Sequence, residues 1–548
     1  MKPAPALWVF RGLLALLFVL LLAYAAGQRF AQPLTPICDP DTPGYLNPAL
    51  SQLSGQGLQQ THGRSFLYPV VILGLLKASG DLKSIVVAQH LASLLTAIVW
   101  MGIWVIWISF LPENWTRHVV APLLGLAAVG FYLIGAEPIL FGMQVRPEAI
   151  FPLVAGLQIL CLMLFVKARW SAGGKSKDGI VLASGIGAMV FAVASLNLKP
   201  SWGFAFLLSP LVLGLGVFIQ RRGRSLLAAG LPLLAGGLLA LILVAAAPVA
   251  LQWKPDSASK SFLPMLLFAV HANIISDYLR GEVDAGRASP EDAAFSSRLS
   301  SGIEESRHQL GRFVLLGHNP DFLMFSSQTL VQLPGVSTLE ERRAYYFRAL
   351  FSSMARFPNR YVAKWLAQLR AAVFQDPKYL SRPSANLKKL YSASVPLSNS
   401  RYPDLRADLA GSLSRTASET SGLVSSLPAV RVMGPKWLKK AGSVGAVLYP
   451  ASLIAGLILL AAAPFFFRDH LLAVLTALLV SAAALLSAMT VAFVHSFDID
   501  RYLSLQSWLA WLTISCWAAV VFSLVESRLR RQFQTANAVG EKAVNDPA

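Results

Sequence analysis

The chain has 548 residues, of which 55% are hydrophobic and 14% are charged. Soluble domains carry about 25% charged residues, so this composition excludes an ordinary soluble protein and predicts a body that lies in lipid. The net charge of +19 would suit nucleic acid, but much of it lies beside the ends of apolar runs and no nucleic-acid-binding motif accompanies it.

Apolar runs of about 20 residues predict ten membrane-spanning helices. They cover residues 7–26, 84–110, 119–136, 148–167, 180–196, 203–220, 226–250, 443–464, 470–494 and 504–525. Basic clusters follow three of these runs, at 167–177, 221–224 and 528–531. With Lys2 and Arg11 at the start, all three clusters fall on the side of the termini, which the positive-inside rule makes cytoplasmic. Ala23-Tyr24-Ala25 resembles a signal-peptidase site, but the first run is long for a signal and we expect it to be retained.

The predicted fold class is therefore an all-α polytopic membrane protein with interfacial helices and a mostly helical extracytoplasmic insert. We divide it into an N-terminal module of seven spans (1–250), an extracytoplasmic segment (251–442), a C-terminal module of three spans (443–525) and a cytoplasmic tail (526–548). The exported face also receives the loops 27–83, 137–147, 197–202 and 495–503.

Shorter apolar pieces accompany the spans. Residues 66–76 are apolar over only half a span, which predicts a helix lying in the interface. In the insert, residues 262–270 are another short apolar piece, and residues 340–373 have helical periodicity. Residues 381–426 are rich in Ser, which favours partial disorder, while their regular leucines are typical of an interfacial helix.

The first exported loop holds two carboxylates, Asp39 and Asp41, which prolines hold two residues apart, and Tyr45 follows them. A carboxylate at the membrane surface can accept a proton from an attacking hydroxyl, and a second one can orient it or hold a divalent cation. Asp, Pro and Gly also form simple solvated turns, so the residues alone leave both interpretations open. Downstream, His62 and Arg64 stand at the mouth of the short apolar helix, where an arginine can hold a phosphate or merely reach lipid headgroups.

The remaining exported loops repeat this pattern of acids and bases. In the second loop, Glu148 is expected to open the fourth span, where the helix dipole favours a carboxylate. Glu137 is expected to end the third span, where the dipole opposes it, so it is either functional or paired with Arg146. Lys199 lies in a tight loop on the side without a basic bias, so it needs an anionic partner. The last loop carries Asp500 and Arg501.

The order of these motifs resembles the integral-membrane glycosyltransferases of the GT-C superfamily, which include protein O-mannosyltransferases and lipid A aminoarabinose transferases. The shared features are an acidic pair followed by Gly-Tyr, then Arg-x-x-x-Tyr-Pro, an acid at the fourth span, Lys-Pro at 199–200 and Arg-Tyr-Leu at 501–503. They cover about residues 7–210 and 495–525, and their order and sidedness carry the resemblance, since no single motif is specific.

This resemblance implies inverting transfer of a sugar from a polyprenyl-phosphate donor to a glycan, lipid or protein acceptor in the cell envelope. Asp39 or Asp41 would be the general base, and Arg64, Lys199 and Arg501 would hold the donor phosphate. His62, Tyr45, Glu137, Arg146, Glu148 and Asp500 would complete the site.

Asp41 and Glu148 are the candidate ligands for a divalent cation, Mg²⁺ or Mn²⁺. The Arg-Pro-Glu text around Glu148 departs from the family pattern, which weakens the metal role. We expect a bacterial inner membrane and partners limited to membrane lipids, donor and acceptor, without nucleic acid. A transporter or flippase of lipid-linked intermediates is the alternative, which would carry charges in mid-helix and paired broken helices.

Overall fold

The computed structural model describes residues 5–60, 64–170, 178–219, 226–255, 257–333, 336, 338–397, 401–497 and 500–545. Within these residues, nine helical stretches are long and apolar enough to cross a membrane. They lie in α1 (Pro5–Phe30), α4 (Lys83–Ile108), α5 (Ala121–Ile134) with the π-helical turn Thr116–Val120, α7 (Phe151–Trp170), α8 (Asp178–Leu198), α11 (Leu226–Ala250), α20 (Leu438–Phe466), α21 (Leu471–Val494) with the 3-10 turn Arg468–His470, and α22 (Asp500–Asn545). The chain is an all-α polytopic membrane protein, as the sequence predicts.

One expected span differs from the structure. In place of the span expected at 203–220, the described residues form the short helices α9 (Gly203–Phe206) and α10 (Leu208–Ile219), and the apolar stretch Pro200–Gly216 is shorter than a span. A further pair, Phe262–Val270 and Ala272–Asp284, is apolar enough only when taken together and is bent by 81°. The described residues thus hold nine candidate spans, or ten if this bent pair crosses as one.

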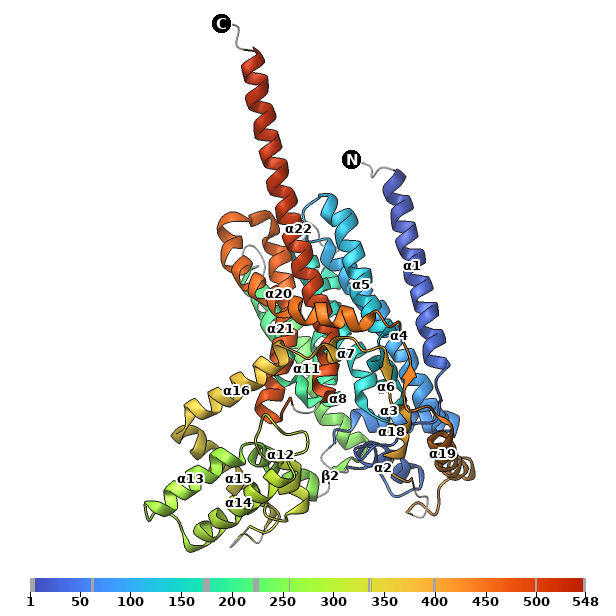
Figure 1. Ribbon diagram of the computed structural model, residues 1–548, viewed down its shortest axis with the longest axis vertical. Helices are drawn as coiled ribbons and strands as arrows, with labels where there is room; N and C mark the ends of the chain where they lie inside the picture. Colours follow the sequence, from blue (N-terminus) through green and yellow to red (C-terminus); the bar gives the residue numbers. More distant parts are fainter. Residues whose placement is uncertain are drawn as a thin grey trace.

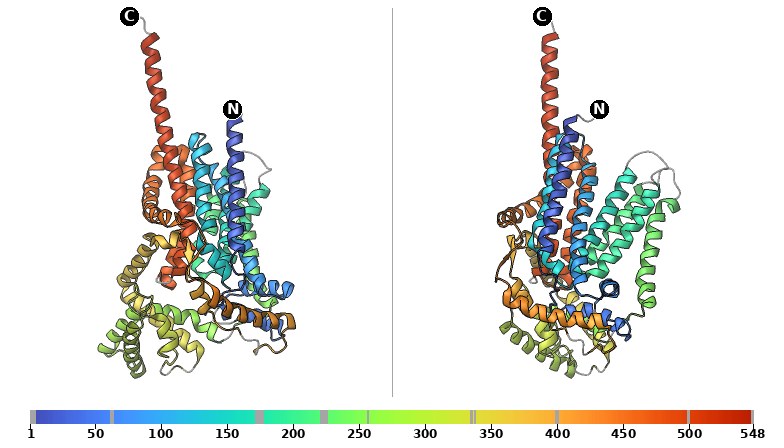
Figure 2. Two further views of the ribbon diagram at one scale, coloured as in Figure 1. Left: turned by 45° about the vertical axis from the view of Figure 1, so that its right-hand side comes forward. Right: turned by 90° about the vertical axis from the view of Figure 1, so that its right-hand side faces the viewer.

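The long helices pack side by side, with both termini at one end of the bundle and the insert at the other (Figures 1 and 2). The short helices of the loops that the sequence predicts to be exported gather at the insert's end. This arrangement brings loops that are far apart in sequence to one face of the bundle, so polar side chains carried by those loops can meet there.

The first loop forms two short helices, α2 (Thr42–Leu53) and α3 (Leu67–Ser79), and α3 confirms the apolar helix expected at 66–76. A left-handed glycine, Gly80 with φ 65°, ends α3. A Cβ there would lie 2.1 Å from the Asp408 carboxylate, so glycine fits this close approach for steric as well as conformational reasons.

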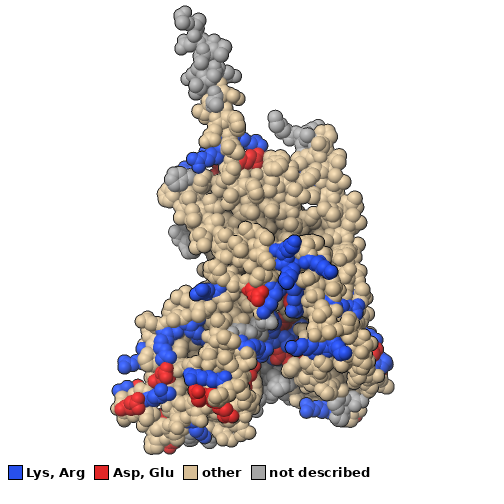
Figure 3. All heavy atoms as spheres, viewed as in Figure 1, with Lys and Arg blue, Asp and Glu red and all other residues tan. Residues whose placement is uncertain are grey.

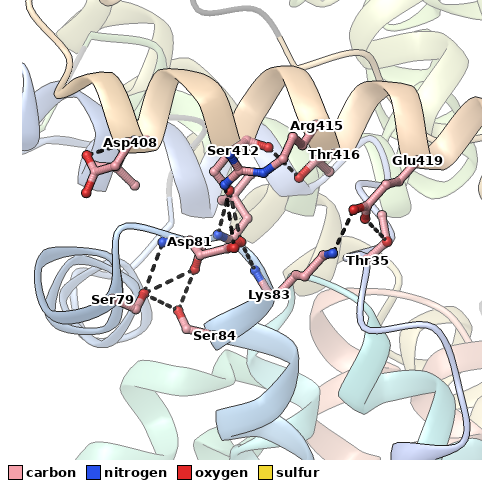
Figure 4. A network of polar contacts seen from close by, with 12 residues as sticks. Thr35, Ser79, Asp81, Lys83, Ser84, Asp408, Ser412, Arg415, Thr416 and Glu419 are labelled. Carbon is pink, nitrogen blue, oxygen red and sulfur yellow. Dashed lines mark hydrogen bonds and ion pairs between the residues drawn. The ribbon is translucent and has the colours of Figure 1, made fainter.

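Asp408 belongs to α19 (Ala407–Ser426), an amphipathic helix in the Ser-rich part of the insert. Leu409 and Leu413 are buried on one face of α19, as their spacing predicts. Ser412 donates to Asp81 at 3.0 Å, and Lys83 pairs with Glu419 at 2.6 Å, which ties this helix to the start of α4 (Figure 4). Of the two alternatives for this segment, the leucine periodicity and not the composition predicts the described structure.

The rest of the insert packs around a core of its own and then returns to the bundle. Its helices are α12 (Ser257–Val270), α13 (Ala272–Asp284), α14 (Pro290–His308), α15 (Leu339–Arg356), α16 (Pro358–Val373), α17 (Pro377–Leu380) and α18 (Leu387–Ser392), with a π-helical turn at Phe322–Ser326. A capping box of Thr338 and Glu341 begins α15. Gln368 on α16 accepts a hydrogen bond from the Phe497 amide at 2.7 Å, which joins the insert to the last exported loop.

Four two-residue strands make two small pairings in the described residues. β1 (Gln59–Gln60) pairs in parallel with β2 (Lys254–Pro255), and β3 (Ser384–Ala385) pairs antiparallel with β4 (Arg431–Val432). One short helix, α6 (Ala136–Met143), and two 3-10 turns, Pro147–Ala149 and Pro200–Trp202, complete these loops in the described residues.

α22 has 46 residues and runs from the exported loops through the bundle and out at the far end (Figure 1). At that far end, the Glu526 carboxylate accepts hydrogen bonds from the amides of Trp115 and Thr116, at 2.9 and 2.8 Å. Glu526 therefore caps the helical turn that begins the third candidate span.

Candidate active site

Asp39 lies in the turn before α2 and is held from two sides. Its Oδ1 accepts hydrogen bonds from the amides of Asp41 and Thr42, at 2.9 and 3.1 Å, so it satisfies free donors at the start of the helix. Its Oδ2 forms an ion pair with Arg146, which comes from the second exported loop. The side chain of Asp39 is 14% exposed, so this carboxylate is partly shielded but still reachable.

Asp41 receives arginines from three other parts of the chain. Arg64 lies 2.5 Å from its Oδ1, and Arg501, in the first turn of α22, pairs with its Oδ2. Arg146 approaches the same Oδ2 at 3.4 Å. One carboxylate thus gathers three guanidinium groups, although it remains 23% exposed.

The two aspartates differ in their electrostatics. Burial raises the pKa of Asp39 above its ordinary value, and the Arg146 guanidinium offsets this only in part. Burial also opposes ionisation of Asp41, but Arg501 and Arg64 outweigh it and hold the pKa of Asp41 well below its usual range. Asp39 is therefore the better proton acceptor of the pair, and Asp41 is a permanent anion.

Glu148 and Lys199 form a buried ion pair between the second and third exported loops. Their side chains are 1% and 7% exposed, and the Lys199 Nζ lies 2.5 Å from the Glu148 Oε1. Burial would raise the pKa of Glu148, but the Lys199 ammonium together with the Arg146 and Arg501 guanidinium groups outweighs it, and the pKa of Glu148 falls to about 2. Glu148 lies in the 3-10 turn before α7, close to the helix start where it is expected.

Aromatic rings make cation–π contacts with three of the cations. The Lys199 Nζ and the Arg501 guanidinium lie 5.1 and 5.3 Å from the centre of the Tyr502 ring. The Arg64 guanidinium lies 5.0 Å from the Tyr45 ring centre, so Tyr45 lies beside the cations of the candidate site. Tyr502 is not among the expected site residues, although it stands in the Arg-Tyr-Leu motif directly after Arg501.

Hydrogen bonds below these side chains fix the loops against each other. The Ile37 amide donates to the Met143 carbonyl at 2.8 Å, which joins the first loop to the second. Gln89 of α4 donates to the Gln144 carbonyl at 2.8 Å, and Tyr68 of α3 donates to Gln89 at 2.5 Å. These contacts set the direction of the segment that carries Arg146.

A second contact joins the first loop to the third. Ser65 donates to the Asn197 side chain at 2.7 Å, one residue from Arg64 and two from Lys199. Together, the described residues bring three carboxylates and four cations into one cluster: Asp39, Asp41, Glu148, Arg64, Arg146, Lys199 and Arg501. With all seven ionised, the cluster keeps one net positive charge.

Glu137 does not belong to this cluster. It lies in the first turn of α6 and not at the end of the preceding span, so the helix dipole favours it, contrary to our expectation. Its partner is Arg382 of the insert, at 2.5 Å, and not Arg146, which is occupied by the two aspartates. Local sequence gives no signal for a partner 245 positions away in the chain.

The described structure does not include the side chains of two further expected site residues. His62 lies outside the described residues. Asp500 begins α22, but its side chain is outside the described part of the chain.

The arrangement of donors does not fit the expected divalent cation. Arginines engage both oxygens of Asp41, and Lys199 lies against Glu148. Among the described residues, no group of three or more His, Cys, Asp or Glu side chains is placed to hold a metal. The cation remains a prediction.

No family model and no curated protein match the chain. A search of solved structures returns a crystal structure of ArnT from Cupriavidus metallidurans bound to undecaprenyl phosphate, with 11% identity and a TM-score of 0.27 over 93% of this chain and 78% of that one.

Proposed function

We propose that this protein transfers a sugar from a polyprenyl-phosphate donor to a hydroxyl group of an acceptor, at the extracytoplasmic face of a bacterial inner membrane. The observation that carries the proposal is the convergence of four cations and three carboxylates from separate loops at the ends of the spans. A cluster with net positive charge favours an anionic ligand, and carboxylates beside it can accept protons.

The donor phosphate would bind at Arg64 and Arg501. Both guanidinium groups point at oxygens of Asp41, and a phosphate offers oxygens in a similar arrangement. Lys199 is next to Arg501 over the Tyr502 ring and would meet the negative charge that develops on the leaving phosphate. A lipid-linked phosphate lies at headgroup depth, where the ends of the spans place these cations.

Asp39 would act as the general base. The acceptor oxygen attacks the anomeric carbon of the donor, the bond from that carbon to the phosphate oxygen breaks, and the electron pair leaves with the polyprenyl phosphate. The proton of the acceptor hydroxyl passes to Asp39, whose raised pKa suits it to this role. A single displacement of this kind inverts the configuration at the anomeric carbon.

The test is release of polyprenyl phosphate from a panel of polyprenyl-phosphate sugars, measured by mass spectrometry with purified protein and envelope lipid or glycan extracts as acceptors. We expect Asp39→Asn to lower the rate at least about 100-fold, because it removes the proton acceptor. The acid limb of the wild-type kcat/KM profile should lie above pH 3.8, the ordinary value from which the pKa of Asp39 is raised.

Asp408→Asn is the matched control, since Asp408 is an exposed carboxylate on α19 that pairs with Arg406 at 2.5 Å. It should keep the full rate. Equal rates for Asp39→Asn and wild type, with equal thermal stability, would overturn the role of Asp39. Movement of the intact donor across vesicles without its consumption would favour the transporter alternative.

A further inference from the structure

Helix α16 of the insert packs against the end of a candidate span. Its residue Ala372 is buried in one apolar cluster with Ala488 and Val491, which lie in the last two turns of α21. The apolar stretch that makes α21 a candidate span runs as far as Val494. One side of α16 is therefore attached to the bundle at the depth of the span and not only in the water beyond it.

Polar contacts hold α16 in the same place. The Lys364 ammonium donates to the Ala492 carbonyl at 3.4 Å. The Gln368 amide donates to the Ser496 hydroxyl at 3.1 Å and accepts from the Phe497 amide. These contacts join two successive turns of α16 to the end of α21 and to the segment that follows it, so the depth of α16 is tied to that of the span.

The opposite side of α16 carries exposed apolar side chains. Residues that follow each other at a spacing of four form one row along a helix. On α16 and the residue directly after it, this row consists of Val362, Leu366, Arg370 and Phe374, which we call the α16 row. The three apolar members are 45%, 61% and 62% exposed. A row this apolar is unfavourable in water, so it calls for a covering surface.

Arg370 is the charged member of the α16 row. It is exposed, and no acid pairs with it within the described residues. A long arginine side chain can lie along apolar surroundings and carry its guanidinium to a lipid phosphate. A cation between apolar side chains therefore suits the boundary between acyl chains and headgroups.

The place of α16 in the molecule agrees with such a boundary. On the face shown in Figure 3, charged side chains are numerous over the insert and few over the upper half of the bundle. In the same view, α16 leaves the side of the bundle between these two regions, whereas α13 and α14 lie farther from the bundle (Figure 1). Since the apolar surface of a bundle faces lipid and a charged surface faces water, α16 lies where the two meet.

A second copy of the chain fits the α16 row less well than lipid does. Stable protein interfaces use about 20–30 residues a side. The α16 row offers only four side chains from a single helix. Lipid needs no such area, and it continues the surface that already surrounds α21.

We propose that the α16 row lies against membrane lipid at the end of the bundle that carries the insert. Its apolar side chains reach the upper acyl chains, and the Arg370 guanidinium binds the phosphate of a lipid headgroup. Through Gln368, this contact holds the segment that leads to Arg501 at a fixed depth. The contact does not depend on the proposed sugar transfer.

A nitroxide spin label at Leu366→Cys tests the proposal, in the full chain without its three native cysteines. The protein is reconstituted in vesicles of phosphatidylglycerol and phosphatidylethanolamine. Power saturation then compares collisions with oxygen, which concentrates in lipid, and with a nickel chelate, which stays in water. We expect the oxygen-to-nickel ratio at position 366 to be at least about tenfold higher than at an exposed position in the insert. Glu304→Cys is that matched control, since Glu304 is 63% exposed on α14.

The role of Arg370 has its own variant. Arg370→Glu replaces attraction to lipid phosphate by repulsion, so it should lower the oxygen-to-nickel ratio at position 366 at least about threefold. Arg343→Glu is the control and should leave the ratio unchanged. Arg343 is also exposed and has no acid partner within the described part of the chain, but it lies near the start of α15. Both variants should keep the melting temperature of the labelled parent protein.

Three results would overturn the proposal. A ratio at position 366 as low as that at position 304 would show that the α16 row faces water. Low collision rates with both reagents would show that protein covers the row, either a second copy or another partner. An unchanged ratio in Arg370→Glu would show that Arg370 does not bind lipid phosphate.

Discussion

The Lys199 ammonium lies 2.5 Å from a carboxylate oxygen of Glu148, and this pair is almost fully buried. Removal of one partner from a buried pair costs about 3–5 kcal/mol, because the other charge remains without compensation. We therefore expect Glu148→Gln to lower the unfolding free energy of the purified protein by that amount. Adding Lys199→Met should recover part of the loss. Thermal unfolding in detergent measures both, and a double variant as unstable as the sum of the single ones would contradict the pairing.

The same pair gives a pH dependence of known sign. The pKa of Glu148 falls from 4.5 to about 2 on folding, so its contribution to stability is present above pH 4.5 and disappears as the pH falls toward 2. The contribution at neutral pH is about 3 kcal/mol. The unfolding free energy of wild type should fall by this amount as the pH falls from 4.5 toward 2. That of Glu148→Gln should depend less on pH. Parallel profiles for the two proteins would show that folding does not lower the pKa of Glu148.

Asp41→Asn should separate binding from turnover. It removes the anion that competes with a phosphate for Arg64 and Arg501, so we expect a lower KM for the donor. The arginines also lose the carboxylate that holds them in place, so we expect kcat to fall at least about tenfold. Steady-state kinetics with varied donor measures both constants. An unchanged kcat with a raised KM would show instead that Asp41 contacts the donor directly.

Arginine geometry at the site can be tested without loss of charge. Arg64→Lys and Arg501→Lys should each raise the donor KM about tenfold, because an ammonium cannot make the paired hydrogen bonds of a guanidinium. Arg415→Lys is the control, since Arg415 is 57% exposed on α19 and lies 3.6 Å from Asp81. If Arg64→Lys and Arg501→Lys had the same donor KM as the control Arg415→Lys, the paired hydrogen bonds of these arginines would not contribute to donor binding.

The sidedness of the loops can be measured with single cysteines in a background that lacks Cys38, Cys161 and Cys516. Gln56→Cys in the first loop and Glu113→Cys after α4 are both exposed positions at opposite ends of α4. A membrane-impermeant thiol reagent applied to intact cells should label Gln56→Cys alone. Labelling of both from outside would contradict the topology.

The sequence predicts which residues gather at the site, because the order of the spans fixes the membrane face at which each loop lies. Asp39, Asp41, Glu148, Lys199 and Arg501 are expected at one membrane face, and the described structure brings their side chains into one cluster. Sidedness restricts them to the same plane, and the short loops restrict them further. Their roles in transfer stay predictions.

What the sequence does not predict depends on contacts between distant residues. Arg146 can pair with any nearby acid, and only the folded loops direct it to Asp39 and Asp41 and away from Glu137. The partner of Glu137 comes from the insert, for which the sequence offers no motif. The different pKa values of the two aspartates also arise in the fold, because the number of guanidinium groups near each depends on three separate loops.

The continuity of α22 links the two faces of the membrane mechanically. Arg501 at one end holds Asp41, and Glu526 at the other holds the amides of Trp115 and Thr116. The two residues are 25 positions apart in one helix, which corresponds to about 38 Å. We therefore expect that a donor whose binding shifts the start of α22, and not only the Arg501 side chain, also moves Glu526 against the amides of Trp115 and Thr116. A spectroscopic probe near Glu526 would then report, from one end of the bundle, on events at the candidate active site at the other end.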